Sequence, residues 1–273
     1  MHRSIVILLV GMLGCASGRS VDPSGLGGPL PAGDPDRGRV LGRKYCTSCH
    51  GLEGDGRGEA AAGLEREPRS FVRAVYRYRS TPSGSLPTDR DLARSIARGL
   101  PGTSMAGFGA FLTRRELMDL VAWVKSFSDR FEMEEVDPPV EIPPPPKTTP
   151  ALVAQGKALY LELECDKCHG ALGRGDGTAS DEELQDNLGR VVRPRDFTDG
   201  LYRGGGRAED LYRTFVTGLD GSPMPAYEDT LAPEEVYAVV AYLRELERDP
   251  SPWRWLVRAP RWWDGLTDRE ARR

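Results

Sequence analysis

The two halves of this chain carry the same residues at a constant separation, and this internal repeat constrains the fold more than any other feature. Three pairs of residues stand 119 positions apart, namely Cys46 and Cys165, His50 and His169, and Met105 and Met224. The separation slips to 126 positions at Phe71 and Phe197, between blocks that match at 119. Chance does not produce such a match over half a chain, so the sequence predicts two tandem copies of one domain.

Each copy predicts a few helices joined by long loops rich in glycine and proline, and no segment has a persuasive strand pattern. The first helix of each copy is expected to start at a capping residue followed by proline, namely Asp34 with Pro35 and Thr149 with Pro150. A further helix is expected near residues 91–98, with its copy near 210–217. The sequence therefore predicts an all-α fold.

The last helix of each copy has the clearest helical pattern. In the first copy it begins with a capping box formed by Thr113 and Glu116. Apolar residues then recur at helical spacing in both copies, at Leu117, Leu120, Val121 and Val124 and at Val236, Val239, Val240 and Leu243. These residues are expected to face a core, and Met118 in the same helix is expected to be structural.

A motif of the form C-x-x-C-H occurs once in each copy, at residues 46–50 and 165–169. This motif is typical of covalent haem c attachment. The two thiols, three positions apart, reach the two vinyl groups of the porphyrin and form thioethers, and the adjacent histidine becomes the proximal ligand of the iron. The sequence thus predicts two covalently bound haem c groups, one held by Cys46, Cys49 and His50 and the other by Cys165, Cys168 and His169.

Two other uses of paired cysteines fit the sequence less well. The four thiols could form a zinc site, but a histidine follows each pair at once and a proline-rich spacer separates the pairs. A redox-active disulfide of the thioredoxin kind would need a surrounding βαβ pattern, which neither motif has. Haem attachment is therefore the preferred interpretation.

The sixth iron ligand in each copy is expected to be methionine. The chain has three histidines, and the one outside the two motifs is His2, in the N-terminal apolar region. Met105 and Met224 each follow the motif histidine by 55 positions and lie in loops rich in glycine and proline. Such a loop can present the thioether sulfur from the far side of the ring, and histidine–methionine ligation raises the potential relative to two histidines.

With these motifs in this order, both halves resemble class I c-type cytochromes, over residues 36–130 and 151–247. The resemblance implies a small all-α domain in which the first and last helices cross beside the haem. The predicted organisation is a signal peptide at 1–14, a flexible tether at 15–35, a first cytochrome c domain at 36–132, a proline-rich linker at 133–150, a second cytochrome c domain at 151–248 and a Trp- and Arg-rich tail at 249–273.

One position departs from the family's pattern. Trp123 and Tyr242 match the aromatic residue of the family's last helix, and Tyr160 matches the aromatic residue of the first helix in the second copy. In the first copy Leu41 and Gly42 stand at that place. The packing around the first haem is therefore expected to differ from that around the second.

A short motif of the form P-R-x-F also recurs, and it suggests residues that support the haem. Pro68 and Pro194 are candidates for the backbone carbonyl that orients each proximal histidine. Arg69, Arg79 and Arg195 are candidates for pairing with haem propionates, because guanidinium binds carboxylate in a fork. The alternative for each arginine is an ordinary solvated surface charge.

The N-terminus predicts export. The apolar run at 5–14 is too short to span a bilayer and is typical of a secretory signal. Leu13 and Gly14 before Cys15 resemble a bacterial lipobox, which predicts a lipid on Cys15, and the alternative is a cleaved signal without a lipid. The C-terminal tail carries Trp253, Trp255, Trp262 and Trp263 among arginines. This composition favours contact with a partner protein or with lipid headgroups, and the alternative is packing against the second domain.

Composition and motifs together predict an electron carrier. The formal net charge is −4 and no basic stripe is present, which argues against nucleic acid as a partner. We expect electron transfer between redox proteins, such as a respiratory complex, an oxidase or an oxidoreductase, on the periplasmic or extracytoplasmic face of a bacterial membrane, and no catalysis by the chain itself. The alternatives are a haem enzyme, such as a dihaem peroxidase or a sulfur-compound dehydrogenase, and a haem-based sensor. Both would need an open or displaceable position on the iron.

Overall fold

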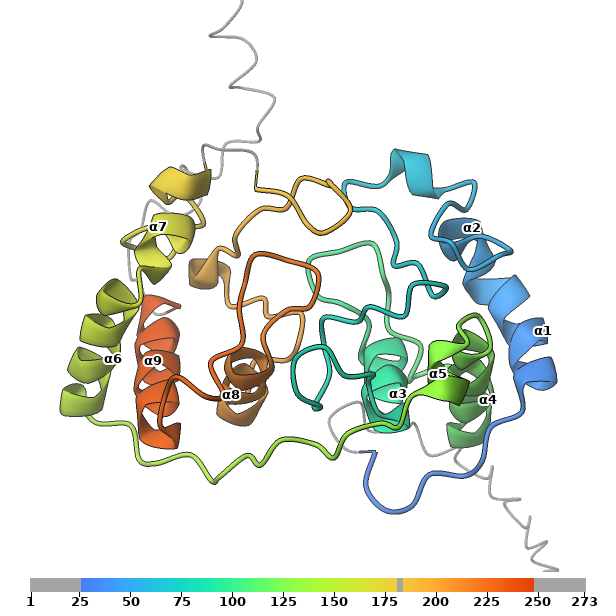
Figure 1. Ribbon diagram of the computed structural model, residues 1–273, viewed down its shortest axis with the longest axis horizontal. Coiled ribbons are helices and arrows are strands. Elements are labelled where there is room, and N and C mark those ends of the chain that lie inside the picture. The colour runs from blue at the N-terminus through green and yellow to red at the C-terminus, as the bar shows by residue number, and fades with distance from the viewer. Residues whose placement is uncertain (1–25, 181–183, 248–273) are drawn as a thin grey trace, which may run out of the picture. The chain divides into compact units, whose positions relative to one another are not determined.

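The computed structural model describes residues 26–180 and 184–247, which form two compact units (Figure 1). The first unit holds residues 26–74 and 89–135, and the second holds residues 75–88 with the described part of the chain from 136 onward. The segment 75–88 therefore belongs to the first repeat in sequence and to the second unit in space. The predicted division into continuous domains placed this segment in the first domain.

The elements repeat in the same order in the two units. The first unit contains the helices α1 (Pro35–Tyr45), α2 (Thr47–His50), η1 (Ala61–Gly63), α3 (Asp89–Arg98), α4 (Arg114–Lys125) and α5 (Arg130–Met133). The second contains α6 (Pro150–Glu162), α7 (Cys165–His169), η2 (Thr178–Ser180), η3 (Phe197–Asp199), α8 (Ala208–Thr217) and α9 (Pro233–Leu246). The described residues hold no β-strand, only an isolated bridge between Gln185 and Val191. The all-α prediction is confirmed.

The predicted helix starts are confirmed by their caps. The side chain of Asp34 accepts hydrogen bonds from the first turn of α1, and Thr149 accepts one of 3.2 Å from the amide of Leu152 at the start of α6. At α4, the Glu116 amide donates to Thr113 Oγ1 at 3.3 Å, while the Thr113 amide donates to the Glu116 carboxylate at 2.8 Å. These bonds satisfy backbone donors that have no partner inside the helix.

The apolar face predicted for each last helix is the core of its unit. α4 packs against α1 and α3, and α9 packs against α6 and α8. Every residue of the two predicted faces exposes 5% or less of its surface, and so does Met118. Burial of these side chains is the main favourable term for joining the helices.

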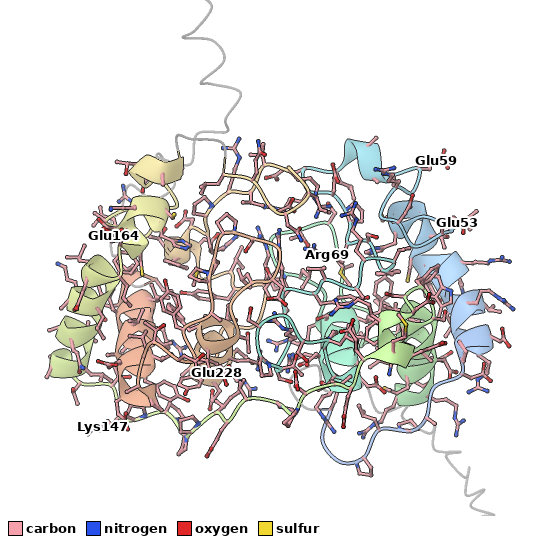
Figure 2. The ribbon with its side chains drawn as sticks, in the orientation of Figure 1. Glu53, Glu59, Arg69, Lys147, Glu164 and Glu228 are labelled. Atoms are coloured by element: carbon pink, nitrogen blue, oxygen red, sulfur yellow. The ribbon has the colours of Figure 1, made fainter. Side chains whose placement is uncertain are left out.

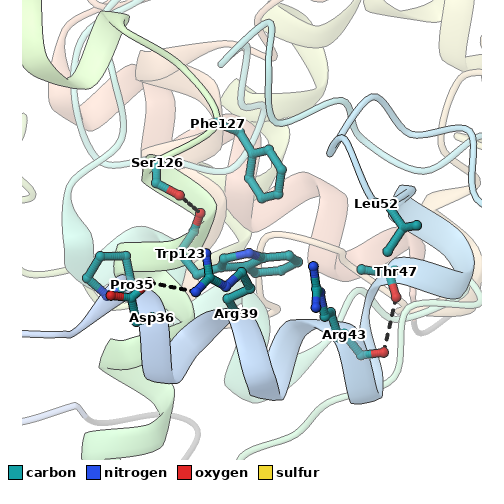
Figure 3. Close-up of a pocket in the computed structure, with 9 residues that line it drawn as sticks. All are labelled: Pro35, Asp36, Arg39, Arg43, Thr47, Leu52, Trp123, Ser126 and Phe127. Atoms are coloured by element: carbon teal, nitrogen blue, oxygen red, sulfur yellow. Dashed lines mark hydrogen bonds and ion pairs between the residues drawn. The ribbon is translucent and has the colours of Figure 1, made fainter.

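In the first unit, α1 and α4 cross closely because α1 presents glycines. A Cβ atom at Gly38 would collide with the carbonyl of Asp119, and a Cβ atom at Gly42 would collide with the indole of Trp123. Arg37 in α1 donates from Nε and Nη2 to the two carboxylate oxygens of Asp119, both at 2.8 Å. Next to this crossing lies a cavity of about 340 Å³ (Figure 3), lined by Pro35, Asp36, Arg39, Arg43, Thr47, Leu52, Trp123, Ser126 and Phe127.

In the second unit, a tyrosine occupies the place of Gly42. The ring of Tyr160 is buried and lies 5.3 Å from that of Tyr242, edge to face, and its hydroxyl donates to the Gly170 carbonyl at 2.6 Å. The departure noted in the first repeat thus has a steric reason. There the indole of Trp123 fills the space that two smaller tyrosine rings share in the second unit.

The second unit also has one more residue between its first helix and its cysteine motif. The helix glycines Gly38 and Gly156, each set against the facing helix backbone, stand 118 positions apart, whereas Cys46 and Cys165 stand 119 apart. The extra residue is accommodated at Glu164, which lies between α6 and α7 (Figure 2). Its φ of 57° is in the left-handed region. Because Glu164 takes up the extra position, the helical turns α2 and α7 both end on the histidine of the cysteine motif.

Residues 1–25, 181–183 and 248–273 are outside the described parts of the chain, so the predicted signal peptide, Cys15 and the C-terminal tail lie there. None of the described helices combines the length and the apolar character that a membrane span requires.

Candidate functional site

Each cysteine motif forms a single helical turn that ends on its histidine, in α2 and in α7. The Nδ1 atom of His50 lies 2.8 Å from the carbonyl oxygen of Arg69, and that of His169 lies 3.0 Å from the carbonyl oxygen of Arg195. A carbonyl only accepts hydrogen bonds, so Nδ1 carries the proton and Nε2 keeps its lone pair. That tautomer is the one that can ligate a metal through Nε2.

The carbonyl that orients each histidine comes from arginine, and the prediction that Pro68 and Pro194 supply it is wrong by one residue. The carbonyl of each proline instead faces a glycine of the loop after the motif. A Cβ atom at Gly56 would lie 2.6 Å from the Pro68 oxygen, and Gly56 itself has φ of 85°. Gly175 lies against Pro194 in the same way. Arg69 is marked in Figure 2.

A phenylalanine stacks against each histidine ring, a role that was not predicted from the sequence. The rings of His50 and Phe71 stack with centroids 4.4 Å apart, and His169 and Phe197 stack at the same distance. The backbone amide of each phenylalanine is tied to the glycine loop, with Phe71 donating to Gly54 at 2.6 Å. The signal was present in the repeated P-R-x-F motif, whose last residue is this ring.

Burial favours the neutral form of both histidines and the protonated form of the first cysteine thiol in each motif. Burial lowers the pKa of His50 and of His169 below the usual range, although the carbonyl contact opposes this. Burial raises the pKa of the Cys46 and Cys165 thiols to about 11. Each unit contains only one pair of these four cysteines, which are not joined by disulfides, so neither unit by itself offers the four thiolates of a structural zinc site.

The methionine loops have the same internal hydrogen bonds in both units. In the first, the amide of Leu100 donates to the Met105 carbonyl at 3.0 Å, and Thr103 Oγ1 donates to the Leu100 carbonyl at 2.7 Å and accepts from the Met105 amide at 3.2 Å. In the second, Leu219, Ser222 and Met224 make the corresponding bonds. Both methionine side chains are half-buried. The turn around each methionine is therefore closed by hydrogen bonds within the loop itself.

Each methionine loop leads back to the cysteine motif of its own unit. The aromatic residue three positions after the methionine is bonded through its amide to the preceding helix, Phe108 to Ile96 and Tyr227 to Phe215, both at 3.0 Å. The ring of Phe108 lies 5.8 Å from that of Tyr45, the residue before Cys46. Burial raises the pKa of Tyr227, and the neighbouring thiols of the Cys165 pair raise it further. The motif and the methionine loop thus border the same region in both units.

The second unit also holds arginine atoms suited to carboxylates. The Nε atoms of Arg77, Arg195 and Arg203 are buried and have no hydrogen-bond partner among the described residues. The guanidinium groups of Arg77 and Arg195 are also paired through Nη2 with Asp186 and Asp199, so a haem propionate would share them with these carboxylates. Arg79, a predicted propionate partner, is used otherwise, because its guanidinium is bonded to Asp220 and to backbone carbonyls.

These features fit a covalently held haem in each unit. Each unit offers two thiols on one turn, a histidine with a free Nε2 and a methionine loop bordering the same region, and the second unit adds buried arginine Nε atoms. Haem c supplies one-electron oxidation and reduction at its iron. Fold and site together define a c-type cytochrome with two haem domains.

Comparison with known proteins agrees with this class. The family described as Cytochrome c matches residues 153–247, and the family described as Cytochrome C oxidase, cbb3-type, subunit III matches residues 33–124. A solved structure of the reducing HAO-like protein complex of Kuenenia stuttgartiensis contains a chain 39% identical to this one, with a TM-score of 0.77, over 80% of this chain and 99% of that chain. Among curated proteins none matches in sequence. The chain belongs to the c-type cytochromes, as two cytochrome c domains in tandem that bind two haem c groups covalently.

Proposed function

We propose that this protein is a dihaem electron carrier of the bacterial cell envelope, with His50 and Met105 as the axial ligands of one iron and His169 and Met224 as those of the other. Haem electron transfer follows from the two cytochrome c domains. The ligand assignment rests on the observation that each unit pairs a histidine tautomer with free Nε2 with a self-bonded methionine loop that borders the same motif.

The residues around each histidine would serve electron transfer by restraining the imidazole ring. The carbonyl of Arg69 or Arg195 fixes the imidazole's tautomer and direction, and the stacked phenylalanine fixes its plane. A redox site that moves little between its two charge states has a small reorganisation cost. The loop bonds of Thr103 and Ser222 restrain the methionines in the same way.

The proposed methionine ligands favour a carrier over a haem enzyme or a sensor. Peroxidase or dehydrogenase chemistry would need an open iron or an acid–base group set above it. With methionine as a ligand on each iron, neither domain offers such a position. The chain would then exchange electrons through the haem edge, without binding a substrate at the metal.

We further propose that the redox partner is an HAO-like protein. The support is the 39% identity to a chain of the reducing HAO-like complex, over 99% of that chain. In such an assembly this chain would accept one electron from a reduced donor protein and pass one electron to an oxidised acceptor, and the bound haems would supply that one-electron chemistry. The respiratory complex or oxidase considered from the sequence is the alternative partner class.

The periplasmic or extracytoplasmic location and the lipid on Cys15 also remain part of this proposal. They rest on the N-terminal apolar run and on Cys15 after Leu13 and Gly14. Fractionation of cells that produce the wild-type protein or Cys15→Ser tests them. We expect the wild type in the membrane fraction and the variant released from it, and equal distribution of the two would contradict the lipid anchor.

A redox titration of the mature protein tests the ligands. We expect two c-type haems, both six-coordinate in both oxidation states, with no carbon monoxide bound to the reduced protein. Met105→Ala and Met224→Ala should each lower the potential of one haem and open that haem to carbon monoxide, because methionine ligation raises the potential. Met133→Ala is the control, since this methionine in α5 is exposed. If Met105→Ala and Met224→Ala left both haems unchanged, the ligand assignment would be wrong.

A further inference from the structure

The two repeats differ by a pair of insertions of equal length. Before the repeated phenylalanine the second repeat is longer, and after it the first repeat is longer. The spacing is 13 positions from Gly58 to Phe71 and 20 from Gly177 to Phe197, but 20 from Phe71 to Asp91 and 13 from Phe197 to Asp210. These insertions account for the slip to 126 positions and the return to 119.

The extra positions of the first repeat fall between Phe71 and Asp91. The segment 75–88 lies in this stretch, and in the second unit it contacts the loop that carries Met224. The side chain of Arg79 is fully buried. Its Nη2 atom donates to the carboxylate of Asp220 at 2.8 Å and to the carbonyl of Thr217 at 2.9 Å. Thr217 is the last residue of α8, and Asp220 stands four positions before Met224.

Asp220 receives two more hydrogen bonds from the same segment. Ser83 Oγ donates to Oδ1 at 3.0 Å, and the amide of Gly84 donates to Oδ2 at 3.0 Å. Arg79 meanwhile donates from Nε to the Pro82 carbonyl at 3.1 Å, which keeps its own segment turned toward the loop. One carboxylate is thus held by three donors, and both of its oxygens are used.

The insertion of the second repeat contacts the neighbouring residue of the same loop. The amide of Asn187 donates to the Gly221 carbonyl at 2.9 Å. Asp186, beside it, accepts from Arg77 of the segment 75–88 at 3.2 Å. Residues of both lengthened stretches therefore contact positions 217–221, shortly before Met224.

The methionine loop of the first repeat lacks the group that this arrangement grips. Its residue at the place of Asp220 is Pro101, which has no carboxylate. The bonds inside the two loops are otherwise the same. Contact with an insertion through a carboxylate is therefore a property of the second haem domain.

We infer that Arg79 and Asp220 are positioning residues for Met224, so that a segment of the first repeat maintains the ligation and the potential of the second haem. This inference rests on the proposed role of Met224 as an axial ligand. A buried guanidinium that loses its carboxylate is left uncompensated, which is strongly destabilising where it occurs. The pair therefore holds the loop in one place, and its loss frees the loop to move away from the iron.

The test uses the mature full-length protein with both haems and the variants Asp220→Asn, Arg79→Gln and Ser83→Ala. We expect Asp220→Asn and Arg79→Gln to lower the potential of one haem, to weaken its methionine-to-iron charge-transfer absorption, and to allow carbon monoxide to bind it. Ser83→Ala removes one exposed donor, should fold normally, and should shift the same haem by less. The other haem serves as the internal reference for folding.

Glu228→Gln is the matched control, because it makes the same acid-to-amide change at an exposed position four residues after Met224 (Figure 2). Met224→Ala identifies which signals belong to the second haem. The inference is overturned if Met224→Ala alters that haem while Asp220→Asn and Ser83→Ala leave it as in Glu228→Gln, or if Asp220→Asn shifts both haems equally. If Met224→Ala itself changes neither haem, the proposed ligation fails, and the inference fails with it.

Discussion

In the first unit the helices α1 and α4 cross with Gly42 against Trp123, and in the second the helices α6 and α9 cross with Tyr160 against Tyr242. In the first unit the indole of Trp123 fills the space between the helices, and Gly42 contributes no side chain. In the second unit two tyrosine rings fill that space. The first unit also joins its helices through Arg37 and Asp119. Two copies of one domain thus reach close packing by different residues, because the interior accepts a given volume and not a given residue.

Around the proposed iron ligands the comparison is the reverse, because the two units use the same bonds. The histidine–carbonyl contact, the stacked phenylalanine and the hydroxyl in the methionine loop occur in both. What differs is the outer support of the methionine loop, where only the second loop has a carboxylate, Asp220, for the segment 75–88 to hold. The bonds within each site give both sites the same local geometry. The contacts of Asp220 with the segment 75–88 add a restraint to the second methionine loop alone.

The largest expected effect comes from removing the aromatic ring that only the second crossing has on its first helix. Tyr160→Ala leaves a cavity beside Tyr242 and should lower the free energy of unfolding of the second unit by about 3–5 kcal/mol. Hydrogen exchange resolved by peptide should show lost protection in α6 and α9 and none in α1 and α4. Tyr160→Phe is the control, since it loses only the bond to the Gly170 carbonyl, about 1 kcal/mol. Equal losses for the two variants would contradict the packing argument.

The reciprocal change tests whether the first crossing is complementary. Gly42→Tyr places a ring where the indole of Trp123 lies and should destabilise the first unit by about 1–3 kcal/mol. Adding Trp123→Tyr reproduces the pair found in the second unit and should recover part of that loss. The measurement is denaturant unfolding of the holoprotein for the single and double variants. A double variant less stable than the sum of both single changes would refute complementarity.

The loop hydroxyls test the difference in outer support. Thr103→Ala and Ser222→Ala each remove two hydrogen bonds inside a methionine loop. Each such bond contributes about 1 kcal/mol to the stability of the loop. We expect Thr103→Ala to lower the potential of the first haem more than Ser222→Ala lowers that of the second, because Arg79 still holds the second loop. Redox titration measures both shifts. The opposite order would show that the outer bonds contribute little.

The smallest expected effect concerns the N-cap of the last helix. Thr113 completes a capping box at α4, whereas α9 has Ala232 at the corresponding place and only the bond from the Ala232 amide to Glu235, at 2.8 Å. Thr113→Ala should cost about 1 kcal/mol in the first unit, and Ala232→Ser should stabilise the second by about 0.5 kcal/mol. Thermal unfolding measures both changes. Equal melting of wild type and both variants would show that neither cap limits stability.

The sequence predicted the helices and the core because their signals are local. Caps such as Asp34 and Thr113 and the apolar face that includes Leu117 depend on neighbours within a few positions, and the structure confirms them. The two haems could also be predicted, because the same motif residues recur at one fixed separation. Residues tied to distant partners were harder. Pro68 was chosen for a carbonyl that Arg69 provides, because a shift of one residue in a loop leaves no trace in the sequence.

By itself the sequence determined that the chain is all-α, that it repeats, and that it binds two haem c groups, since covalent attachment requires fixed residues at fixed spacing. Only the tertiary structure decided that Phe71 and Phe197 flank the histidines, that Gly42 and Trp123 share one space, and that the segment 75–88 serves the second unit. The physical reason is distance along the chain. The bond from Arg79 to Asp220 joins residues 141 positions apart, and no local propensity or periodicity records such a pair.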